Sequence, residues 1–248
     1  MDEKTELPMA PPESTHRHVL RRYNAGRFHA AAFILVLALY WLVSSFQCQH
    51  EGHRAVPDTL TKNKVPLEAH IMSKCPDARD CLRDLILPTM QNASDKVDFT
   101  LSYIGKVYPH GDEVECKHGQ GECLGNILEL CAASLYPDPK IYLGFTMCLS
   151  NNYSLIPQRS FVTDCALEYG IDFDKLNDCM SKDDGSYGVG LLKESVQRSA
   201  EANVTYSCTV RLDNKVRCIR DGGRWKDCEG GSSVEALLKD IDELYNAS

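Results

Sequence analysis

Cysteine is absent from the first 47 residues of this 248-residue chain, although 12 cysteines follow. Charged residues are absent from residues 29–46, "HAAAFILVLALYWLVSSF". An uncharged apolar run of this length is just sufficient to span a bilayer as a helix. The uncharged run ends at Phe46 and the first cysteine follows at Cys48. The sequence therefore predicts a membrane-spanning segment with every cysteine on its C-terminal side.

The orientation of this segment follows from its flanks. Four arginines precede the apolar run: Arg17, Arg21, Arg22 and Arg27. Positively charged flanks stay in the cytosol, so we expect a single-pass type II membrane protein. Its predicted parts are a cytosolic tail (1–28), a transmembrane signal anchor (29–46), a lumenal stem (47–64) and a lumenal domain (65–248). A cleaved signal peptide, which would release a secreted protein, is the alternative, although the charged leader is long for one.

A lumenal location agrees with two further features. Disulfides form in secretory compartments rather than in the cytosol, which suits a chain rich in cysteine. Four acceptors for N-glycosylation also lie after the apolar run: Asn92, Asn152, Asn203 and Asn246. We therefore expect a disulfide-bonded glycoprotein in the secretory system or in an endolysosomal or vacuolar lumen.

A basic surface is missing as well. The formal net charge is −8, and no basic stripe follows residue 60. Nucleic acid is therefore excluded as a main partner, because phosphate binding needs a positive surface. The sequence also contains no internal repeat and no low-complexity tract.

Hydrophobic patterns predict the order of elements. Residues 65–72 and 96–105 read as strands, and between them Ala78, Leu82, Leu85 and Ile86 recur on one helix face. A strand-helix-strand order predicts a parallel pair with a right-handed connection. Helical segments follow, then a hairpin around the turn "LDNK", and a final amphipathic helix over 233–245. We predict an α/β thioredoxin-like fold with a disulfide-rich helical insertion at about 116–190.

Cys75 stands where an extended run ends and a helix begins, directly before Pro76. Proline is favoured in the first helical turn, where its missing donor has no partner. Unpaired N–H groups and the positive end of the helix favour a thiolate at this place, and the thiolate is the nucleophile in disulfide exchange. We predict that Cys75 is a reactive nucleophile; the alternative is one half of a structural disulfide.

Residues 116–131, "CKHGQGECLGNILELC", resemble the signature of the gamma-interferon-inducible lysosomal thiol reductase family, Cys-Gln-His-Gly-x2-Glu-Cys-x2-Asn-x4-Cys. Lys117 replaces the glutamine, and the matching residues are Cys116, His118, Gly119, Glu122, Cys123, Asn126 and Cys131. The resemblance covers roughly residues 65–190. It implies a thioredoxin-like domain that reduces disulfide-containing proteins in an acidic lumen, with no bound cofactor and an external thiol such as glutathione or cysteine as reductant.

We expect this signature to be structural, with its cysteines cross-linking the insertion and His118 and Gly119 shaping the turn into it. A zinc site at Cys116, His118, Cys123 and Cys131 is the alternative. The Cys-x-His spacing is awkward for tetrahedral ligation, and an oxidising lumen favours disulfides, so no metal is expected.

Two residues that the resemblance implies are missing. Active family members carry Cys-x-x-Cys, and Cys75 matches the first cysteine, but Ala78 stands at the second position. Thioredoxin-like sites also place a proline opposite the nucleophile, whereas "TYSCTV" (205–210) has none. Ser207 or Cys208 is then expected at that place, and Cys208 is a possible partner of Cys75.

Another thiol must therefore release a mixed disulfide formed at Cys75. Cys81 is a candidate catalytic partner, but in one continuous helix the two cysteines are separated by a rise of about 9 Å, beyond the roughly 7 Å that a disulfide spans. A helix that begins later, capped by Asp77, would let Cys75 fold back toward Cys81 and shorten this distance. Three alternatives stay open: Cys81 resolves after rearrangement, an external thiol resolves, or Cys81 is tied structurally to another cysteine.

The predicted function is reduction of protein disulfides through Cys75, by a protein that contacts the membrane through its own N-terminal helix. A catalytically inactive module that is cross-linked by disulfides and binds proteins is the alternative. An isomerase or oxidase is a third class, which would differ from a reductase in the redox poise of Cys75. The segment "CIRDGGRWKDC" (218–228) is expected to be a structural loop closed by a disulfide. A role for its Arg220, Arg224 and Trp225 in gripping substrate is the less favoured reading.

Overall fold

The computed structural model describes residues 34, 36–42, 63–108 and 113–247. Residues 34 and 36–42 are helical, their side chains are exposed, and they belong to a different compact unit from the residues after position 61. Within the described ranges, none of the helices has the length and hydropathy needed to cross a membrane. The predicted cytosolic tail, most of the signal anchor and nearly all of the stem lie outside the described residues.

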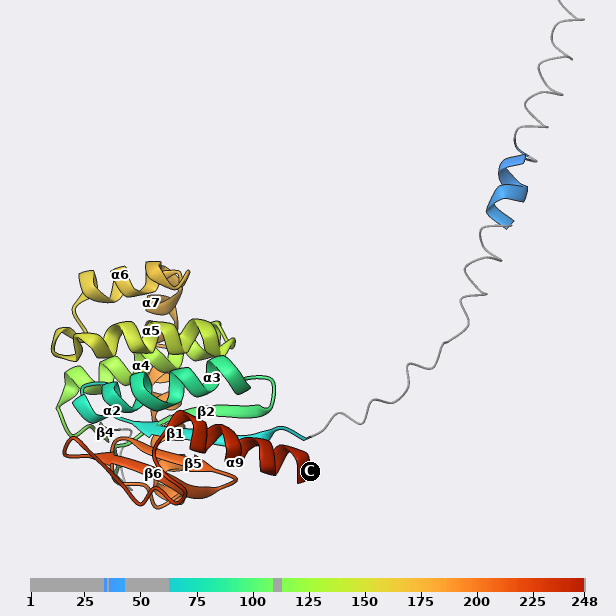
Figure 1. Ribbon diagram of the computed structural model, residues 1–248. Coiled ribbons are helices and arrows are strands. Elements are labelled where there is room, and N and C mark those ends of the chain that lie inside the picture. The colour runs from blue at the N-terminus through green and yellow to red at the C-terminus, as the bar shows by residue number, and fades with distance from the viewer. Residues whose placement is uncertain (1–33, 35, 43–62, 109–112, 248) are drawn as a thin grey trace, which may run out of the picture. The chain divides into compact units, whose positions relative to one another are not determined.

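The domain contains a five-stranded sheet in the order β2-β1-β5-β6-β7, which lies below helices α2 to α7 in Figure 1. β1 (Val65–Ile71) and β2 (Val97–Tyr103) are parallel, as the strand-helix-strand order predicts. β5 (Thr209–Leu212), β6 (Lys215–Asp221) and β7 (Arg224–Lys226) continue the sheet with antiparallel pairing. Asp213 and Asn214 form the predicted turn with φ of 49° and 62°, the left-handed conformation that a two-residue hairpin loop requires.

The connection between β1 and β2 is helical but changes its winding. α2 (Pro76–Cys81) continues into a π-helical segment, η1 (Leu82–Ile86), and then into α3 (Leu87–Ala93). Pro88 lies in the first turn of α3, where it lacks the N–H that regular α-helical bonding would use, and the wider π turn precedes it. The predicted apolar face is confirmed: Ala78, Leu82, Leu85 and Ile86 are each at most 1% exposed.

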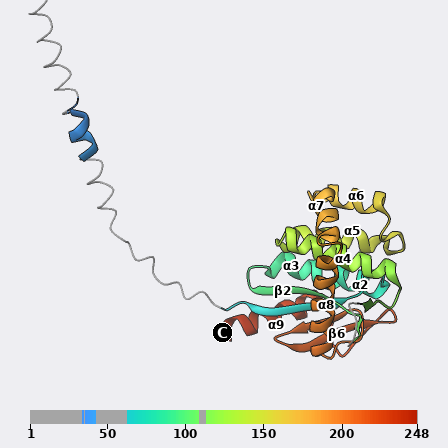
Figure 2. The same cartoon turned by 180° about the vertical axis from the view of Figure 1, so that it is seen from behind.

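Helices cover both faces of the sheet. α9 (Val234–Ala247) buries Leu237 and Ile241 on the side of α3. α8 (Ser186–Glu201) crosses the opposite face, which Figure 2 shows from behind. Ser199 Oγ in α8 lies 2.8 Å from the Nδ1 atom of His70 in β1. β1 is therefore buried on both faces.

The helical insertion lies between the small hairpin of β3 (Lys106–Val107) and β4 (Val114–Glu115) and helix α8. Four α-helices are described there: α4 (Gln120–Leu135), α5 (Pro139–Asn151), α6 (Arg159–Glu168) and α7 (Phe173–Ser181), with a short 3-10 helix, η2 (Tyr153–Leu155), after α5. The predicted helical insertion and the α/β class are confirmed. Disulfides fasten α4 to α7 through Cys131–Cys179 and α5 to α6 through Cys148–Cys165.

Candidate functional site

Cys75 is the N-cap residue of α2, directly after the loop that follows β1. Its backbone is extended, with φ of −102° and ψ of 127°, and its carbonyl accepts a hydrogen bond from the backbone N–H of Arg79 at 3.2 Å. The helix thus begins at Pro76, whose fixed φ suits the first turn. The later helix start capped by Asp77, which would have brought Cys75 closer to Cys81, does not occur, and the Asp77 carboxylate binds the backbone of Gly222 and Gly223 instead.

The thiol of Cys75 faces the loop that leads into β5. Among the cysteines that the structure describes, Cys75 is the one outside a disulfide, and it is 9% exposed. Its Sγ donates to the carbonyl of Ser207 at 3.6 Å, and the hydroxyl of Ser207 accepts from the backbone N–H of Met72 at 2.9 Å. Ser207 therefore occupies the place opposite the predicted nucleophile, as expected, and the Ser207–Cys208 peptide bond is cis.

Cys81 is not brought to Cys75. It is bonded to Cys208, with the two Cα atoms 6.2 Å apart and both residues fully buried. Because α2 is continuous from Pro76 to Cys81, the two cysteines stay at opposite ends of the helix. Of the three alternatives for Cys81, the structure shows the tie to another cysteine, which corrects the expectation of a free thiol partner at this position.

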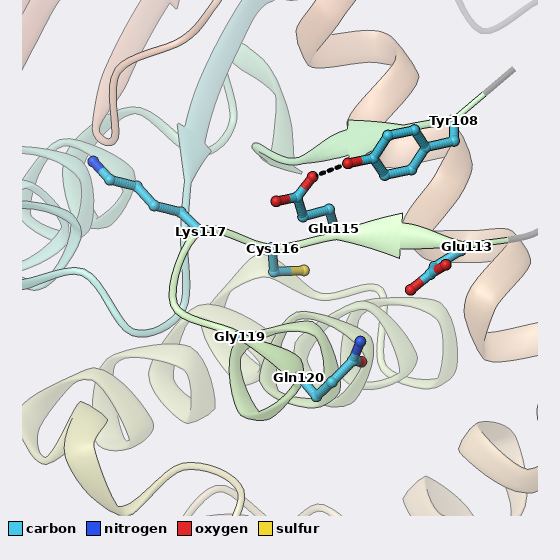
Figure 3. Close-up of a pocket in the computed structure, with 7 residues that line it drawn as sticks. All are labelled: Tyr108, Glu113, Glu115, Cys116, Lys117, Gly119 and Gln120. Atoms are coloured by element: carbon cyan, nitrogen blue, oxygen red, sulfur yellow. Dashed lines mark hydrogen bonds between the residues drawn. The ribbon is translucent and has the colours of Figure 1, made fainter.

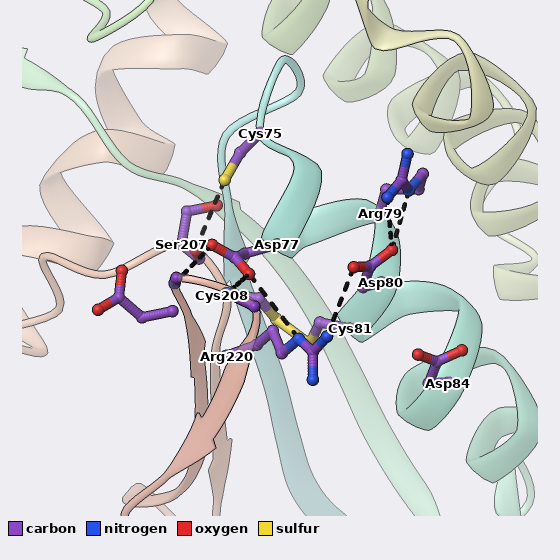
Figure 4. A network of polar contacts seen from close by, with 12 residues as sticks. Cys75, Asp77, Arg79, Asp80, Cys81, Asp84, Ser207, Cys208 and Arg220 are labelled. Carbon is purple, nitrogen blue, oxygen red and sulfur yellow. Dashed lines mark hydrogen bonds and ion pairs between the residues drawn. A yellow bond between two sulfur atoms is a disulfide. The ribbon is translucent and has the colours of Figure 1, made fainter.

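Polar contacts fasten the turn between β6 and β7 to α2 (Figure 4). The Asp77 carboxylate accepts from the backbone N–H groups of Gly222 and Gly223 at 2.9 and 2.8 Å. Arg220 reaches Asp80 at 3.5 Å, and its guanidinium lies 5.3 Å from the ring centre of Trp225. The carboxylates of Asp77 and Asp80 are thus both engaged by groups of the β6–β7 region.

The loop that carries these groups is closed by the predicted disulfide between Cys218 and Cys228. Arg79, which follows Cys75 by four positions, is turned away from the thiol and pairs with Asp80 at 2.8 Å.

The residues of the signature lie at the start of α4. A disulfide joins Cys116 and Cys123, and Gly119 at the N-cap has a φ of 80° that favours glycine. His118 donates its backbone N–H to Glu122 at 3.2 Å, and its ring Nδ1 lies 2.5 Å from the same carboxylate. These contacts shape the turn into α4 as predicted. The cysteines of the alternative zinc site are held in disulfides and offer no thiolates to a metal.

The signature also supports the residues directly before Cys75, a link that sequence reasoning missed. Asn126 accepts from the backbone N–H of Ser73 at 3.0 Å, and the Ser73 hydroxyl donates to the carbonyl of Glu122 at 3.2 Å. A Cβ on Gly125 would lie 2.6 Å from Ser73 Oγ, so glycine is needed for this approach. Lys74 then donates to the carbonyl of Ile156 at 2.7 Å. Local sequence patterns do not predict contacts between residues that lie this far apart in the chain.

A buried acid lies further along α4. Burial, with a smaller contribution from the charge of Glu122, raises the pKa of Glu129 to about 8. The hydroxyl of Tyr103 donates to Glu129 at 2.6 Å, while Glu129 Oε1 is buried without a partner. Glu129 is therefore protonated at neutral and acidic pH, and it joins α4 to β2 as a neutral group.

A polar pocket of about 630 Å³ opens beside the β3–β4 hairpin (Figure 3). Tyr108 donates its hydroxyl to Glu115 at the rim of this pocket. The lining residues are Tyr108, Glu113, Glu115, Cys116, Lys117, Gly119 and Gln120. Cys75 is outside this set, so the pocket is not the surroundings of the free thiol.

Residues 66–169 match the family model of gamma interferon inducible lysosomal thiol reductase. A curated relative from Anopheles gambiae, a gamma-interferon-inducible lysosomal thiol reductase-like protein, is 27% identical over 139 residues, covering 50% of this chain and 58% of its own. A gamma-interferon-responsive lysosomal thiol protein from Arabidopsis thaliana is 29% identical over 96 residues, covering 36% and 39%. The chain thus spans about half the length of the curated relatives it matches.

Two solved structures show the same fold. The thiol-disulfide oxidoreductase MdbA from Corynebacterium diphtheriae superposes with a TM-score of 0.51 at 13% identity, covering 74% of this chain and 86% of its own. The thiol-disulfide exchange protein alpha-DsbA2 from Wolbachia pipientis gives 0.50 at 15% identity, covering 74% and 83%. The predicted thioredoxin-like fold is confirmed by these likenesses. Residues 66–169, which carry the signature, are thus similar to the gamma-interferon-inducible lysosomal thiol reductase family.

Proposed function

We propose that this protein carries out thiol-disulfide exchange through Cys75 and reduces disulfide bonds of protein substrates. One observation carries the proposal: Cys75 is a free thiol at the N-terminus of α2, facing the Ser207 carbonyl. The similarity of residues 66–169 to the thiol reductase family and the thioredoxin-like fold support it. Cys75 stands at the N-cap of α2, directly after the loop that follows β1, which is where the sequence predicts the nucleophile.

The exchange has two steps. The Cys75 thiolate attacks one sulfur of a substrate disulfide, which forms a Cys75–substrate mixed disulfide and releases the other sulfur as a thiolate. A second thiol then attacks the mixed disulfide and frees the substrate. Because Ala78 stands where a second active-site cysteine is expected, we propose that the electrons come from an external thiol such as glutathione or cysteine, with no bound cofactor.

The test is reduction of insulin by the full chain in mild detergent, with glutathione or cysteine at pH 5 and pH 7. We expect turnover above the thiol background in the wild type and none in Cys75→Ser. Cys148→Ser/Cys165→Ser, which removes a disulfide in the insertion, is the matched control and should stay active. Activity that survives Cys75→Ser would overturn the proposal.

A non-catalytic protein-binding module is the second candidate. The low exposure of Cys75 and the oxidised state of Cys81 favour it. Rapid alkylation of Cys75 at mildly acidic pH, measured by peptide mass spectrometry, separates the two candidates. An inert Cys75 together with no turnover would favour the binding module.

We also propose that the domain is lumenal, glycosylated and anchored by residues 29–46. All four acceptor asparagines, at positions 92, 152, 203 and 246, have exposed side chains, which supports their accessibility to the glycosylation machinery. Expression in cells followed by glycosidase treatment should shift the apparent mass. Protease protection of residues 65–248 in intact vesicles tests the orientation, and cleavage there by added protease would contradict it.

A further inference from the structure

We propose that Cys208 resolves the mixed disulfide formed at Cys75, so that Cys81 and Cys208 act as the internal dithiol of this protein. The inference rests on the proposed function, because it needs Cys75 as the attacking thiol. It assigns to Cys81 and Cys208 the second thiol that Ala78 does not provide.

Residues 207 and 208 contact the cysteines at the two ends of α2. Cys75, at the N-terminus of the helix, meets the carbonyl of Ser207 at 3.6 Å. Cys81, at the C-terminal end, is bonded to the next residue, Cys208. Figure 4 shows Cys75 on one side of Ser207 and the Cys81–Cys208 disulfide on the other. Cys208 therefore follows directly in the chain the residue that the Cys75 thiol contacts.

Direct exchange between Cys75 and Cys81 is prevented by the helix. Six residues of α2 rise about 9 Å along a rigid axis, more than a disulfide spans. Cys208 directly precedes β5 and is not part of α2, and it directly follows Ser207, whose carbonyl the Cys75 thiol contacts. The other described cysteines are paired with one another: Cys116–Cys123, Cys131–Cys179, Cys148–Cys165 and Cys218–Cys228.

Burial makes Cys75 the point of access to this dithiol. Cys81 and Cys208 are 0% exposed, whereas Cys75 is 9% exposed. A thiol dissolved in water therefore meets the Cys75 sulfur first. Reducing equivalents must enter, and leave toward substrate, through Cys75.

Two electrons pass from the Cys81–Cys208 dithiol to the substrate disulfide through successive exchange steps. With Cys81 and Cys208 reduced, Cys75 forms the mixed disulfide, and the Cys208 thiolate attacks the Cys75 sulfur and expels the substrate thiolate. Cys81 then attacks Cys208, which restores Cys75 as a thiol and leaves the Cys81–Cys208 disulfide. The substrate gains two electrons and two protons, and the cysteine pair loses them.

Regeneration runs in the opposite direction. The Cys75 thiolate attacks Cys208 and releases Cys81 as a thiol, and a first glutathione or cysteine molecule attacks Cys75, releasing Cys208. A second molecule of the same thiol frees Cys75 and leaves as the oxidised small-molecule disulfide. The resting structure, with Cys81 and Cys208 joined and Cys75 free, is the oxidised form of this cycle.

Trapping the intermediates tests the inference. The full chain is reduced, freed of reductant, mixed with a disulfide-containing peptide, quenched with acid and mapped by mass spectrometry. In Cys208→Ser we expect a persistent Cys75–peptide adduct, because Cys81 does not reach Cys75. In Cys81→Ser we expect a Cys75–Cys208 disulfide instead. The double variant Cys148→Ser/Cys165→Ser should behave as the wild type, which ends with Cys81–Cys208 joined.

Each outcome bears on one proposal. If Cys81→Ser keeps the peptide on Cys75 for as long as Cys208→Ser does, Cys208 is not the resolving thiol and the inference fails, while the proposed function stands. If no variant that retains Cys75 forms an adduct or a Cys75–Cys208 bond, Cys75 is unreactive and the proposed function fails.

A second measurement avoids variants in the buried disulfide, which could hinder folding. Glutathione is added to the oxidised wild type and to Cys75→Ser, and opening of Cys81–Cys208 is followed by alkylation. We expect opening to be at least about ten-fold slower in Cys75→Ser, while the partly exposed Cys218–Cys228 disulfide opens equally fast in both. Equal opening of Cys81–Cys208 in the two proteins would overturn the inference.

Discussion

The helical insertion and the sheet around Cys75 use cysteine in opposite ways. Disulfides in the insertion join secondary-structure elements: Cys131–Cys179 links α4 to α7, and Cys148–Cys165 links α5 to α6. Near the sheet, the N-terminus of α2 keeps a free thiol beside a loop that carries the Cys81–Cys208 disulfide. A cysteine inside a packed helix is suited to cross-linking, whereas one at a helix N-terminus is suited to exchange.

The two regions are nevertheless coupled. The insertion holds the backbone of Ser73 through Asn126, two residues before Cys75. The family signature therefore does more than fasten the insertion, because one of its residues positions the chain that presents the thiol.

The largest effect should come from removing the free thiol. We predict that Cys75→Ser abolishes insulin reduction but changes the free energy of unfolding by less than about 1 kcal/mol, since the replacement has nearly the same shape. Turnover assays and denaturant unfolding measure the two quantities. Loss of folding in Cys75→Ser would remove the distinction between the two regions.

Removing a disulfide of the insertion should have the reverse effect. We predict that Cys131→Ser/Cys179→Ser lowers the free energy of unfolding by about 4 kcal/mol and Cys148→Ser/Cys165→Ser by about 3 kcal/mol, because the first closes the longer loop. The sequence separations are 48 and 17 residues. Denaturant unfolding without reductant gives the values, and Cys75 should still be alkylated under native conditions. The opposite order of the two double variants would contradict the loop-closure argument.

Glu129 should make stability depend on pH. Burial raises its pKa to about 8 in the folded state, above the unfolded value, so the folded protein binds the extra proton in between. The stabilising contribution is complete below the unfolded pKa and is lost as pH rises through about 8. We predict that Glu129→Gln, which stays neutral, is more stable than the wild type by up to about 4 kcal/mol at pH 8 and equal to it near pH 4.

Thermal unfolding across this pH range, compared between the two proteins, measures the effect. His70 contributes with the opposite sign, because burial lowers its pKa and its stabilising contribution is lost as pH falls. That contribution is present in both proteins and cancels in the difference. A difference that does not grow with pH would mean that Glu129 is ionised in the folded protein.

The coupling between the regions should give the smallest effect. We predict that Asn126→Ala lowers the free energy of unfolding by about 1 to 2 kcal/mol, because the buried N–H of Ser73 loses its acceptor. Alkylation of Cys75 should become faster as the preceding loop loosens. Ser73→Ala is the control, since it keeps the backbone N–H contact with Asn126 and removes only the hydroxyl bond to Glu122. Equal alkylation rates in Asn126→Ala and Ser73→Ala would argue against the coupling.

Sequence patterns correctly predicted those secondary-structure elements whose formation depends on residues close together in the chain. The length and mixed pattern of residues 65–72, the apolar face of Ala78, Leu82 and Leu85, and the turn at Asp213 and Asn214 each lie within a few residues of their effect. They predicted the parallel pair, the connecting helix and the hairpin. β7 was missed because three residues between a glycine turn and a loop carry no period.

The amino-acid sequence alone thus determined the element order, the helical insertion and the position of Cys75 at a helix start, because propensity and periodicity act over one or two turns of chain. The tertiary structure alone decided that Cys81 pairs with Cys208 and that Asp77 holds the β6–β7 turn. It also decided that Asn126 supports the backbone of Ser73, from which it is separated by 53 residues of chain. Such pairings depend on which surfaces the packed sheet and helices bring together. Local sequence patterns cannot predict them, because the paired residues are far apart in the chain.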